Sequence, residues 1–394
     1  MEEKKSKKKI VWRVISYVAV AVCASAITVG VCMLFPRRTA MSKLDVLEQY
    51  IDRCYIEDVD LTQIEDAAAD AMVKAVGNRW SYYIPASEMQ KHVDDQNNAY
   101  VGIGITISQR EDKSGFTVTA VQPGSGAESA GILRGDILTG VEGQNVTGME
   151  TSALTDIVRG KENTTVSITV LRGEETHTYT VVRGNVLSVV ATGQMLDNNI
   201  GLVQINNFNE RCAQETLDAI KALTAQGAEA LIFDVRYNPG GYKGELVKIL
   251  DYLLPEGEIF HSVDYTGKEE IDRSDADCLD LPMAVLINGD TYSAAEYFAA
   301  ALREYDRATL VGQPTTGKNH FQYTLPLGDG SGVNLSVGKY VTPKGVSLVD
   351  VGGLKPDIEI AVDGTADKDI HTGNIAPEED VQIRAAIRAL NGEK

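Results

Sequence analysis

The spacing of apolar residues divides this 394-residue chain into regions of different periodicity. In residues 40–97, segments such as LDVLEQYIDRCY and IEDAAADAMVKAV carry apolar side chains at helical spacing, until the stretch NRWSYYIP interrupts the pattern. Residues 98–184 instead alternate apolar and polar positions, as in VGIGITIS and TTVSITVLR, with turn signals such as PGSG and EGQN between the runs. The pattern therefore predicts a small helical region at 39–97, followed by a β domain at 98–184.

From about residue 185 the pattern becomes one of strands alternating with helices, which is typical of an α/β core. We expect strands at Asn199–Ile205, Ala230–Val235, Pro282–Asn288 and Gly332–Val341, and helices at Glu210–Gln226, Tyr242–Leu254 and Ala294–Glu304. The segment GLKPDIEI adds a further strand. An amphipathic last segment, Glu378–Leu390, could dock on the core or on a partner subunit. We therefore place the core at 185–375 and a C-terminal helix at 376–394.

A long apolar run stands near the N-terminus. Val14–Phe35 comprises 22 consecutive residues without a charge, which at roughly 1.5 Å per residue match the hydrocarbon thickness of a bilayer. Six basic residues precede the run and only two follow it closely, which favours a cytoplasmic N-terminus. Residues 1–38 are thus predicted to form a basic segment and a single-pass anchor in the cell membrane, with the rest extracytoplasmic. The alternative is a cleaved signal peptide, which usually has a shorter apolar core.

Charge and composition exclude several classes of partner. The net charge is −19, and the first 38 residues hold eight basic and two acidic residues, so the remainder carries −25. An acidic body of this size argues against nucleic acid as a partner. The five cysteines form no CxxC pair, and the five histidines lack metal-binding spacing. We therefore expect neither a metal nor another cofactor.

Three residues of the α/β region suggest chemistry. Ser293 lies where a buried strand turns into an Ala-rich helix, Lys318 follows 25 residues later in TTGKNH, and Gln322 is expected one helical turn beyond it. A lysine can act as general base for a serine when burial lowers its pKa enough to populate the neutral amine. Taken singly, the serine is more typical of a helix N-cap and the lysine of a solvated turn.

The segment Asn288–Gln322 resembles the active-site block of the carboxyl-terminal processing proteases, the tail-specific Ser/Lys peptidases of family S41. The resemblance implies that Ser293 is the nucleophile, Lys318 the base and Gln322 the amide that orients the lysine. Glu296 and Thr315 occupy two further family positions. Three departures leave a single candidate serine in the turn: Thr291 and Ala295 replace two flanking serines, and Asp290 replaces a small residue.

An oxyanion hole is expected beside the serine. Because Ser293 begins a helix, the amide of Ala294 points outward, and the helix dipole adds favourable potential. A second amide is expected from DVRYNPGGY, where Gly240 and Gly241 permit close backbone approach and match a glycine pair of the family. An ordinary Pro-Gly-Gly turn is the alternative. We also expect the hydroxyls of the two threonines before Lys318 to hold its amine without adding charge.

Residues 98–184 resemble a bacterial PDZ domain. The run YVGIG matches its carboxylate-binding loop, which implies peptide binding by Tyr100, Val101, Gly102, Ile103 and Gly104, and Thr151–Arg159 matches its second helix. In this binding mode an extended peptide adds a strand to an open sheet edge. Taken alone, Gly102-x-Gly104 is more often a tight turn.

Together these features predict a multidomain α/β protein with an N-terminal transmembrane helix, a small helical region, a PDZ-like β domain and an α/β serine-protease core. The predicted activity is cleavage of unfolded or flexible C-terminal tails of exported proteins, with the PDZ domain binding the tail and gating the site. A homodimer joined through the helical region is possible by resemblance, and a simple linker is the alternative there. The competing functions are a non-catalytic PDZ receptor for exported C-termini and a signal-peptidase-like enzyme.

Overall fold

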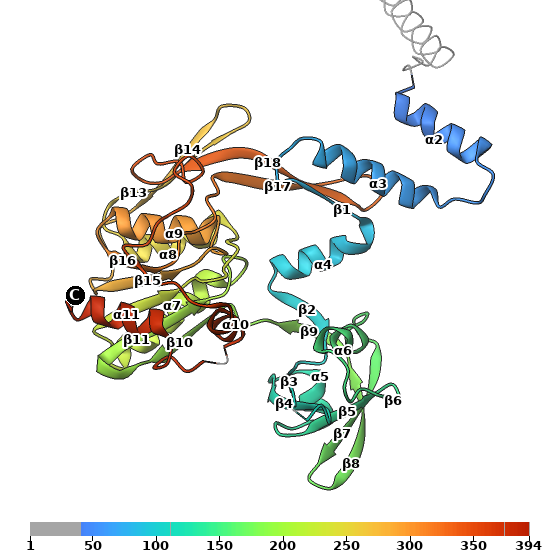
Figure 1. Ribbon diagram of the computed structural model, residues 1–394, viewed down its shortest axis with the longest axis horizontal. Helices are drawn as coiled ribbons and strands as arrows, with labels where there is room; N and C mark the ends of the chain where they lie inside the picture. Colours follow the sequence, from blue (N-terminus) through green and yellow to red (C-terminus); the bar gives the residue numbers. More distant parts are fainter. Residues whose placement is uncertain (1–40, 111, 374, 394) are drawn as a thin grey trace, which may run out of the picture. The chain divides into compact units, whose positions relative to one another are not determined.

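The computed structural model of the protein describes residues 41–110, 112–373 and 375–393 (Figure 1). The predicted basic segment and anchor at residues 1–38 lie outside the described residues. Within the described ranges, no helix is both long and apolar enough to cross a membrane. The chain divides into two units, residues 1–71 and 72–394.

The described part of the first unit consists of helix α2 (Lys43–Cys54) and most of helix α3 (Leu61–Lys74). A capping box begins α2, because the Ser42 hydroxyl accepts from the Asp45 amide and the Asp45 carboxylate accepts from the Ser42 amide. Neither helix has a buried residue. The predicted helical character of this segment is confirmed.

The second unit begins with a strand that the sequence pattern did not predict. β1 (Tyr82–Ile84) forms within NRWSYYIP and pairs antiparallel with β18 (Gly332–Val341), and α4 (Ala86–Gln96) follows it. The strand therefore falls inside the stretch that was expected to interrupt the helical pattern, although a strand was not predicted there. The aromatic pair of β1 pairs with residues about 250 positions later, which local periodicity does not reveal.

A five-strand path, β3-β4-β5-β7-β8, forms the sheet of the β domain predicted at residues 98–184, and β6 pairs with β5. Its elements are β2 (Ala99–Gly102), β3 (Ile105–Gln109), β4 (Phe116–Val121), α5 (Gly126–Ala130), β5 (Ile137–Val141), β6 (Gln144–Asn145), α6 (Thr151–Val158), β7 (Thr165–Arg172) and β8 (Glu175–Val182). Phe116, Leu138 and Ile168 are fully buried in its core. β2 pairs outside this sheet with β9 (Gly184–Leu187).

The α/β core is built on a six-stranded sheet of order β10-β11-β12-β15-β16-β19. Its strands are β10 (Ala191–Met195), β11 (Ile200–Ile205), β12 (Ala230–Asp234), β15 (Met283–Ile287), β16 (Ala308–Gly312) and β19 (Ile358–Glu359). All neighbouring pairs are parallel except β10 with β11. A short 3-10 helix, η1 (Asp197–Asn199), precedes β11.

Helices cover both faces of this sheet (Figure 1). On one face, α7 (Cys212–Ala225), α8 (Lys243–Leu253) and α9 (Ala294–Glu304) pack against alternate strand residues such as Phe233. On the other face, α11 (Val381–Leu390) packs against the intervening residues, such as Ile232. The last helix therefore docks on the core of its own chain, which is one of the two expected alternatives. A shorter helix, α10 (Gly364–Thr372), precedes it.

A second sheet accompanies the α/β core, with the order β1-β18-β13-β14 and with β17 paired to β18. Its remaining strands are β13 (Gly257–Asp264), β14 (Glu269–Ser274) and β17 (His320–Pro326). Gln322 thus lies in a strand, and the expectation of a helical turn from Lys318 to Gln322 is wrong.

Candidate active site

Ser293 occupies a strained turn between the fully buried strand β15 and helix α9. Its backbone has φ of +61° and ψ of −127°, outside the extended region that an N-cap residue prefers, and its side chain makes no capping hydrogen bond. The alternative of a simple helix cap is therefore wrong. Thr291 holds the turn, because its hydroxyl donates to the Val235 carbonyl (2.8 Å) and accepts from the Asn288 amide (3.1 Å).

Lys318 is buried, with 6% of its surface exposed, and its Nζ donates to Gln322 Oε1 at 2.8 Å. Desolvation lowers the pKa of this amine from 10.5 to about 8, against the opposing attraction of Glu296 and with a smaller contribution from Arg79. About a tenth of the amine is therefore uncharged at pH 7, and about half at pH 8. The acceptor is a neutral amide, which binds the lysine without fixing its charge.

The side chain of Gln322 is oriented by two further hydrogen bonds. Its Nε2 donates to the His320 carbonyl (3.0 Å) and to Ser336 Oγ (3.1 Å), which leaves Oε1 facing the Lys318 amine. A bulge between Phe321 and Gln322 shifts the register of β17 against β18 at this point. The strand and its bulge therefore supply the geometry that a helical turn was expected to give.

Glu296 fixes the loop that carries Lys318. Its buried carboxylate accepts from the amides of Gly317 (2.8 Å) and Lys318 (2.9 Å) and from the hydroxyl of Thr315. Burial raises the pKa of Glu296, although these hydrogen bonds oppose the shift. The Thr316 hydroxyl donates to the Gly289 carbonyl (2.6 Å). The expectation that both threonine hydroxyls hold the lysine amine is therefore wrong, since they anchor its loop.

The glycine pair approaches the serine turn closely. A Cβ on Gly240, which has φ of +89°, would lie 2.7 Å from both the Ala294 nitrogen and Ser293 Cβ. The Gly240 amide itself donates to Asn238 Oδ1 (2.8 Å). In the described part of the chain, the amides of Gly241 and Ala294 have no hydrogen-bond partner. Gly240 thus provides space, while the other two amides remain open to a ligand.

Asn238 is a positioning residue that the sequence pattern did not single out. It is fully buried, its Nδ2 donates to the Ile205 carbonyl (2.7 Å), and its own carbonyl accepts from the Tyr292 amide (3.2 Å). Together with its bond to the Gly240 amide, these contacts join the glycine loop to the residue before Ser293. The signal available in the sequence was an amide residue immediately before Pro-Gly-Gly.

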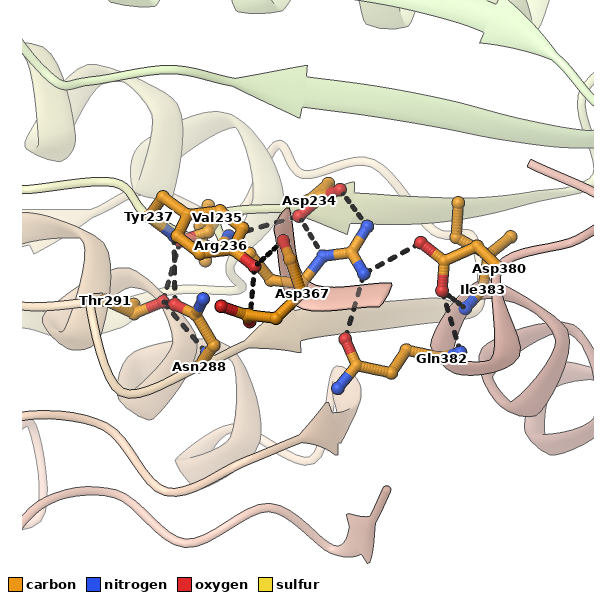
Figure 2. Close-up of polar contacts among 10 residues, drawn as sticks. All are labelled: Asp234, Val235, Arg236, Tyr237, Asn288, Thr291, Asp367, Asp380, Gln382 and Ile383. Carbon is orange, nitrogen blue, oxygen red and sulfur yellow. Dashed lines mark hydrogen bonds and ion pairs between the residues drawn. The ribbon is translucent and has the colours of Figure 1, made fainter. Parts of the chain in front are cut away.

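A network of ion pairs and hydrogen bonds joins residues 234–237, at the end of β12, to the C-terminal helices (Figure 2). The Arg236 guanidinium donates to Asp234 on β12, and to Asp380 (2.8 Å) and Gln382 (2.9 Å) at the start of α11. The Tyr237 hydroxyl donates to the Asp367 carboxylate of α10 at 2.6 Å. The loops after β12 and β15 meet because adjacent parallel strands end at the same edge, and the C-terminal helices brace that edge.

The serine turn, the lysine loop, β17 and the glycine loop line a cleft of about 1050 Å³. Its lining includes Ser293, Lys318, Gln322, Gly240 and Gly241, and it also includes the aromatic residues Trp80 and Tyr292. The structure thus brings the predicted nucleophile, base, amide and glycine pair to one cavity. Within the described ranges, no group of three or more His, Cys, Asp or Glu side chains is placed to hold a metal.

The predicted peptide-binding loop of the PDZ domain is also formed. Tyr100, Val101 and Gly102 lie on β2, Ile103 is buried in the domain core, and Gly104 has φ of +79°. A Cβ on Gly104 would lie 2.3 Å from Ser125 Cβ, so this turn requires glycine. Peptide binding by these residues stays a prediction.

Comparison with known proteins identifies the class to which this fold and cleft belong. Residues 199–360 match the model of peptidase family S41, and residues 117–172 match that of the PDZ domain. The chain is 31% identical over 351 residues to the carboxy-terminal processing protease CtpA of Bacillus subtilis strain 168, covering 86% of this chain and 75% of that protein. It is 29% identical over 363 residues to a probable CtpA-like serine protease of Staphylococcus aureus strain COL, covering 89% and 72%.

Among solved structures, a candidate S41 protease from Bacteroides fragilis NCTC 9343 has a TM-score of 0.55 at 17% identity, covering 88% of this chain and 97% of that chain. That likeness shows a shared fold. The fold and the sequence matches together define a serine peptidase that carries a PDZ domain. The chain belongs to peptidase family S41, the C-terminal processing serine peptidases. It spans 64% of the length of several other staphylococcal relatives.

Proposed function

We propose that this protein is a membrane-anchored, extracytoplasmic endopeptidase that cleaves exported proteins near their C-termini with a Ser293/Lys318/Gln322 set. The observation that carries the proposal is the buried Lys318 amine. It is held by a neutral acceptor and lines the same cleft as Ser293. A solvated surface lysine would have neither feature.

In the proposed reaction, the Ser293 hydroxyl attacks the scissile carbonyl and its proton passes to the neutral Lys318 amine. The resulting ammonium then protonates the leaving amine, and an acyl-enzyme remains. A water molecule next gives a proton to Lys318 and attacks the ester. Lys318 then passes this proton to Ser293 Oγ as the acyl bond breaks, which releases the acid and regenerates the hydroxyl and the neutral amine. The open amides of Gly241 and Ala294 would stabilise the oxyanion, a contribution of about 10²–10³ in rate for each such donor.

The PDZ domain and the N-terminal region complete the proposal. A flexible substrate tail would add a strand to the PDZ edge and place its carboxylate against the loop from Tyr100 to Gly104. The uncharged run at residues 14–35 would attach the enzyme to the cell membrane. Exposed apolar residues of α2, among them Leu47 and Tyr50, are compatible with a homodimer contact in the helical region.

The test uses a flexible peptide with either a free or an amidated C-terminus, together with a serine-reactive fluorophosphonate probe. We expect Ser293→Ala to abolish both cleavage and labelling, and Lys318→Ala to abolish cleavage and reduce labelling. Cleavage of the free-ended peptide should exceed that of the amidated peptide. Unchanged cleavage by Ser293→Ala would refute the proposed nucleophile. Peptide binding by the parent protein without labelling or cleavage would instead favour a non-catalytic PDZ receptor.

A further inference from the structure

A tryptophan from outside the α/β core covers the buried lysine. The Lys318 Nζ lies 4.5 Å from the centroid of the Trp80 ring and 5.8 Å from that of Tyr292. The two rings contact each other at 5.2 Å between centroids, and the Arg79 guanidinium lies 4.2 Å from the Trp80 centroid on the same ring. Trp80 is thus part of an aromatic contact that reaches from the segment before β1 to the residue before Ser293.

The loop that carries Trp80 is fixed at both sides. Asn78 Oδ1 accepts from the Trp80 amide (2.9 Å) and from Ser336 Oγ (3.1 Å). The buried Ser81 accepts through its hydroxyl from the Ser336 amide (3.0 Å). The Trp80 carbonyl accepts from Asn334 Nδ2 at 3.3 Å. Both ends of the loop are therefore bound to β18, so the ring is held in place by a preformed backbone.

The same anchors connect to the lysine through hydrogen bonds. Lys318 Nζ donates to Gln322 Oε1, Gln322 Nε2 donates to Ser336 Oγ, and Ser336 Oγ donates to Asn78 Oδ1. One short chain of side chains thus relates the direction of the amine to the position of the tryptophan loop. The residues that hold the Trp80 loop, Asn78 and Ser336, therefore belong to the same hydrogen-bond chain as the Lys318 amine.

We propose that Trp80 is a positioning residue for the general base: its ring shields the Lys318 amine from water and confines it to the direction of Gln322 and Ser293. This inference rests on the proposed function of Lys318. The ring acts in two opposing ways, since its face attracts an ammonium while its bulk removes water that would stabilise the charge. Burial is the largest influence on the pKa of Lys318, and the Trp80 ring at 4.5 Å is one of the groups that bury the amine.

The other ionisable groups that face the amine do not account for its lowered pKa. The ionisable groups around it are Glu296 from α9, Arg79 and Tyr292 from the two adjoining loops, His320 from β17, and Tyr340 from β18, whose hydroxyl donates to the Lys318 carbonyl. Glu296 raises the pKa of Lys318, and Arg79 lowers it less than burial does. Loss of Trp80 would admit water and move the pKa of Lys318 upward.

The first measurement does not depend on catalysis. In the full-length chain carrying Ser293→Ala, the reactivity of Lys318 toward acetic anhydride is followed by mass spectrometry over a pH series. We expect Trp80→Ala to move the midpoint of this titration to higher pH, and Trp80→Phe, which retains a ring, to move it less. A midpoint that is the same in all three proteins, with thermal unfolding showing that each is folded, would overturn the inference.

The second measurement is the pH dependence of kcat/KM for the same substitutions with Ser293 restored. At neutral pH the neutral fraction of Lys318 would fall by up to about 300-fold if its pKa returned from about 8 to 10.5. We therefore expect Trp80→Ala to lose activity chiefly at neutral pH and to recover part of it at alkaline pH, with kcat affected more than KM. An equal loss at every pH would overturn the inference.

The controls separate the inference from the proposed function. Tyr265→Ala removes an aromatic ring that is 79% exposed at the β13–β14 turn, and it should leave both the titration and the activity unchanged. If Lys318→Arg kept full activity, the proposed function would fail whatever the titration showed. If Lys318→Arg were inactive while Trp80→Ala left the titration unmoved, only the role of Trp80 would be refuted.

Discussion

Replacing Arg236 with methionine should be among the most destabilising single changes in the α/β core. The Arg236 side chain is 4% exposed, and its partners Asp234 and Asp380 are 12% and 1% exposed. Methionine has a comparable apolar stem, so the change removes the guanidinium and leaves the cavity small. It also leaves two largely buried carboxylates without their counter-ion (Figure 2). The expected effect is therefore one of lost charge pairing, with little contribution from lost packing.

The magnitude follows from the burial of these partners. Removing one member of a buried ion pair costs about 3–5 kcal/mol, whereas a pair at the surface contributes about 0–1 kcal/mol. A loss of this size is a large fraction of the roughly 5–15 kcal/mol that stabilises a typical domain. Because Asp380 also caps α11 through the amides of Gln382 and Ile383, unfolding should begin at the C-terminal helix.

Urea unfolding, followed by circular dichroism and by hydrogen exchange of residues 381–390, measures both effects. The matched control is Arg273→Met, which breaks an ion pair with Glu258 whose side chains are 62% and 37% exposed. We expect the control to unfold like the parent protein and Arg236→Lys to fall between the two, since lysine keeps the charge without the planar fork. A free energy of unfolding for Arg236→Met within about 1 kcal/mol of the control would refute the reasoning.

Two further changes test the site itself. Gly240→Ala places a methyl group 2.7 Å from the Ala294 nitrogen. We expect kcat to fall by at least about 10², the effect of losing one oxyanion donor, with little change in KM. Steady-state kinetics on a flexible peptide checks this, and a wild-type kcat would contradict it. Glu296→Gln removes the charge that raises the pKa of Lys318. In the parent protein we expect kcat/KM to rise with pH with a midpoint near 8, and the substitution should move this midpoint to lower pH. A shift to higher pH would show that Glu296 acts mainly by holding the loop.

Much of the fold was predictable because the periodicity of a segment's own residues determines many of its helices and strands. α9 begins and ends where the periodicity predicts, at Ala294 and Glu304, and β18 likewise spans Gly332–Val341. The buried strand β15 differs from its expected range by one residue at each end. β1 was missed because its stability depends on pairing with β18. Its own three residues are too few to show the alternation that predicts a strand. The β13–β14 hairpin was also missed, although its two strands are neighbours in sequence and pair with each other.

For the candidate site, the identity of the residues was predicted, whereas part of their geometry was not. The predicted nucleophile, base and amide come from one contiguous block, and the resemblance of that block to the family's active-site segment singled out Ser293, Lys318 and Gln322. The block was misleading about geometry, because Gln322 reaches the amine from a bulged strand and the threonine hydroxyls bind other partners. Spacing along the chain constrains which side chains can meet, but it does not determine the backbone that brings them together.

The chemistry of the lysine is a property of tertiary packing that no single segment contains. Its loop is held by Glu296 on α9, its amine is directed by Gln322 on β17, and its shielding comes from Trp80, more than 230 residues earlier in the chain. Each contact alone is compatible with a charged lysine. Together they place the amine in a buried position with an amide as its hydrogen-bond acceptor, and burial lowers its pKa to about 8 against the attraction of Glu296. The proposed general base is therefore complete only when the segment before β1 has paired with β18.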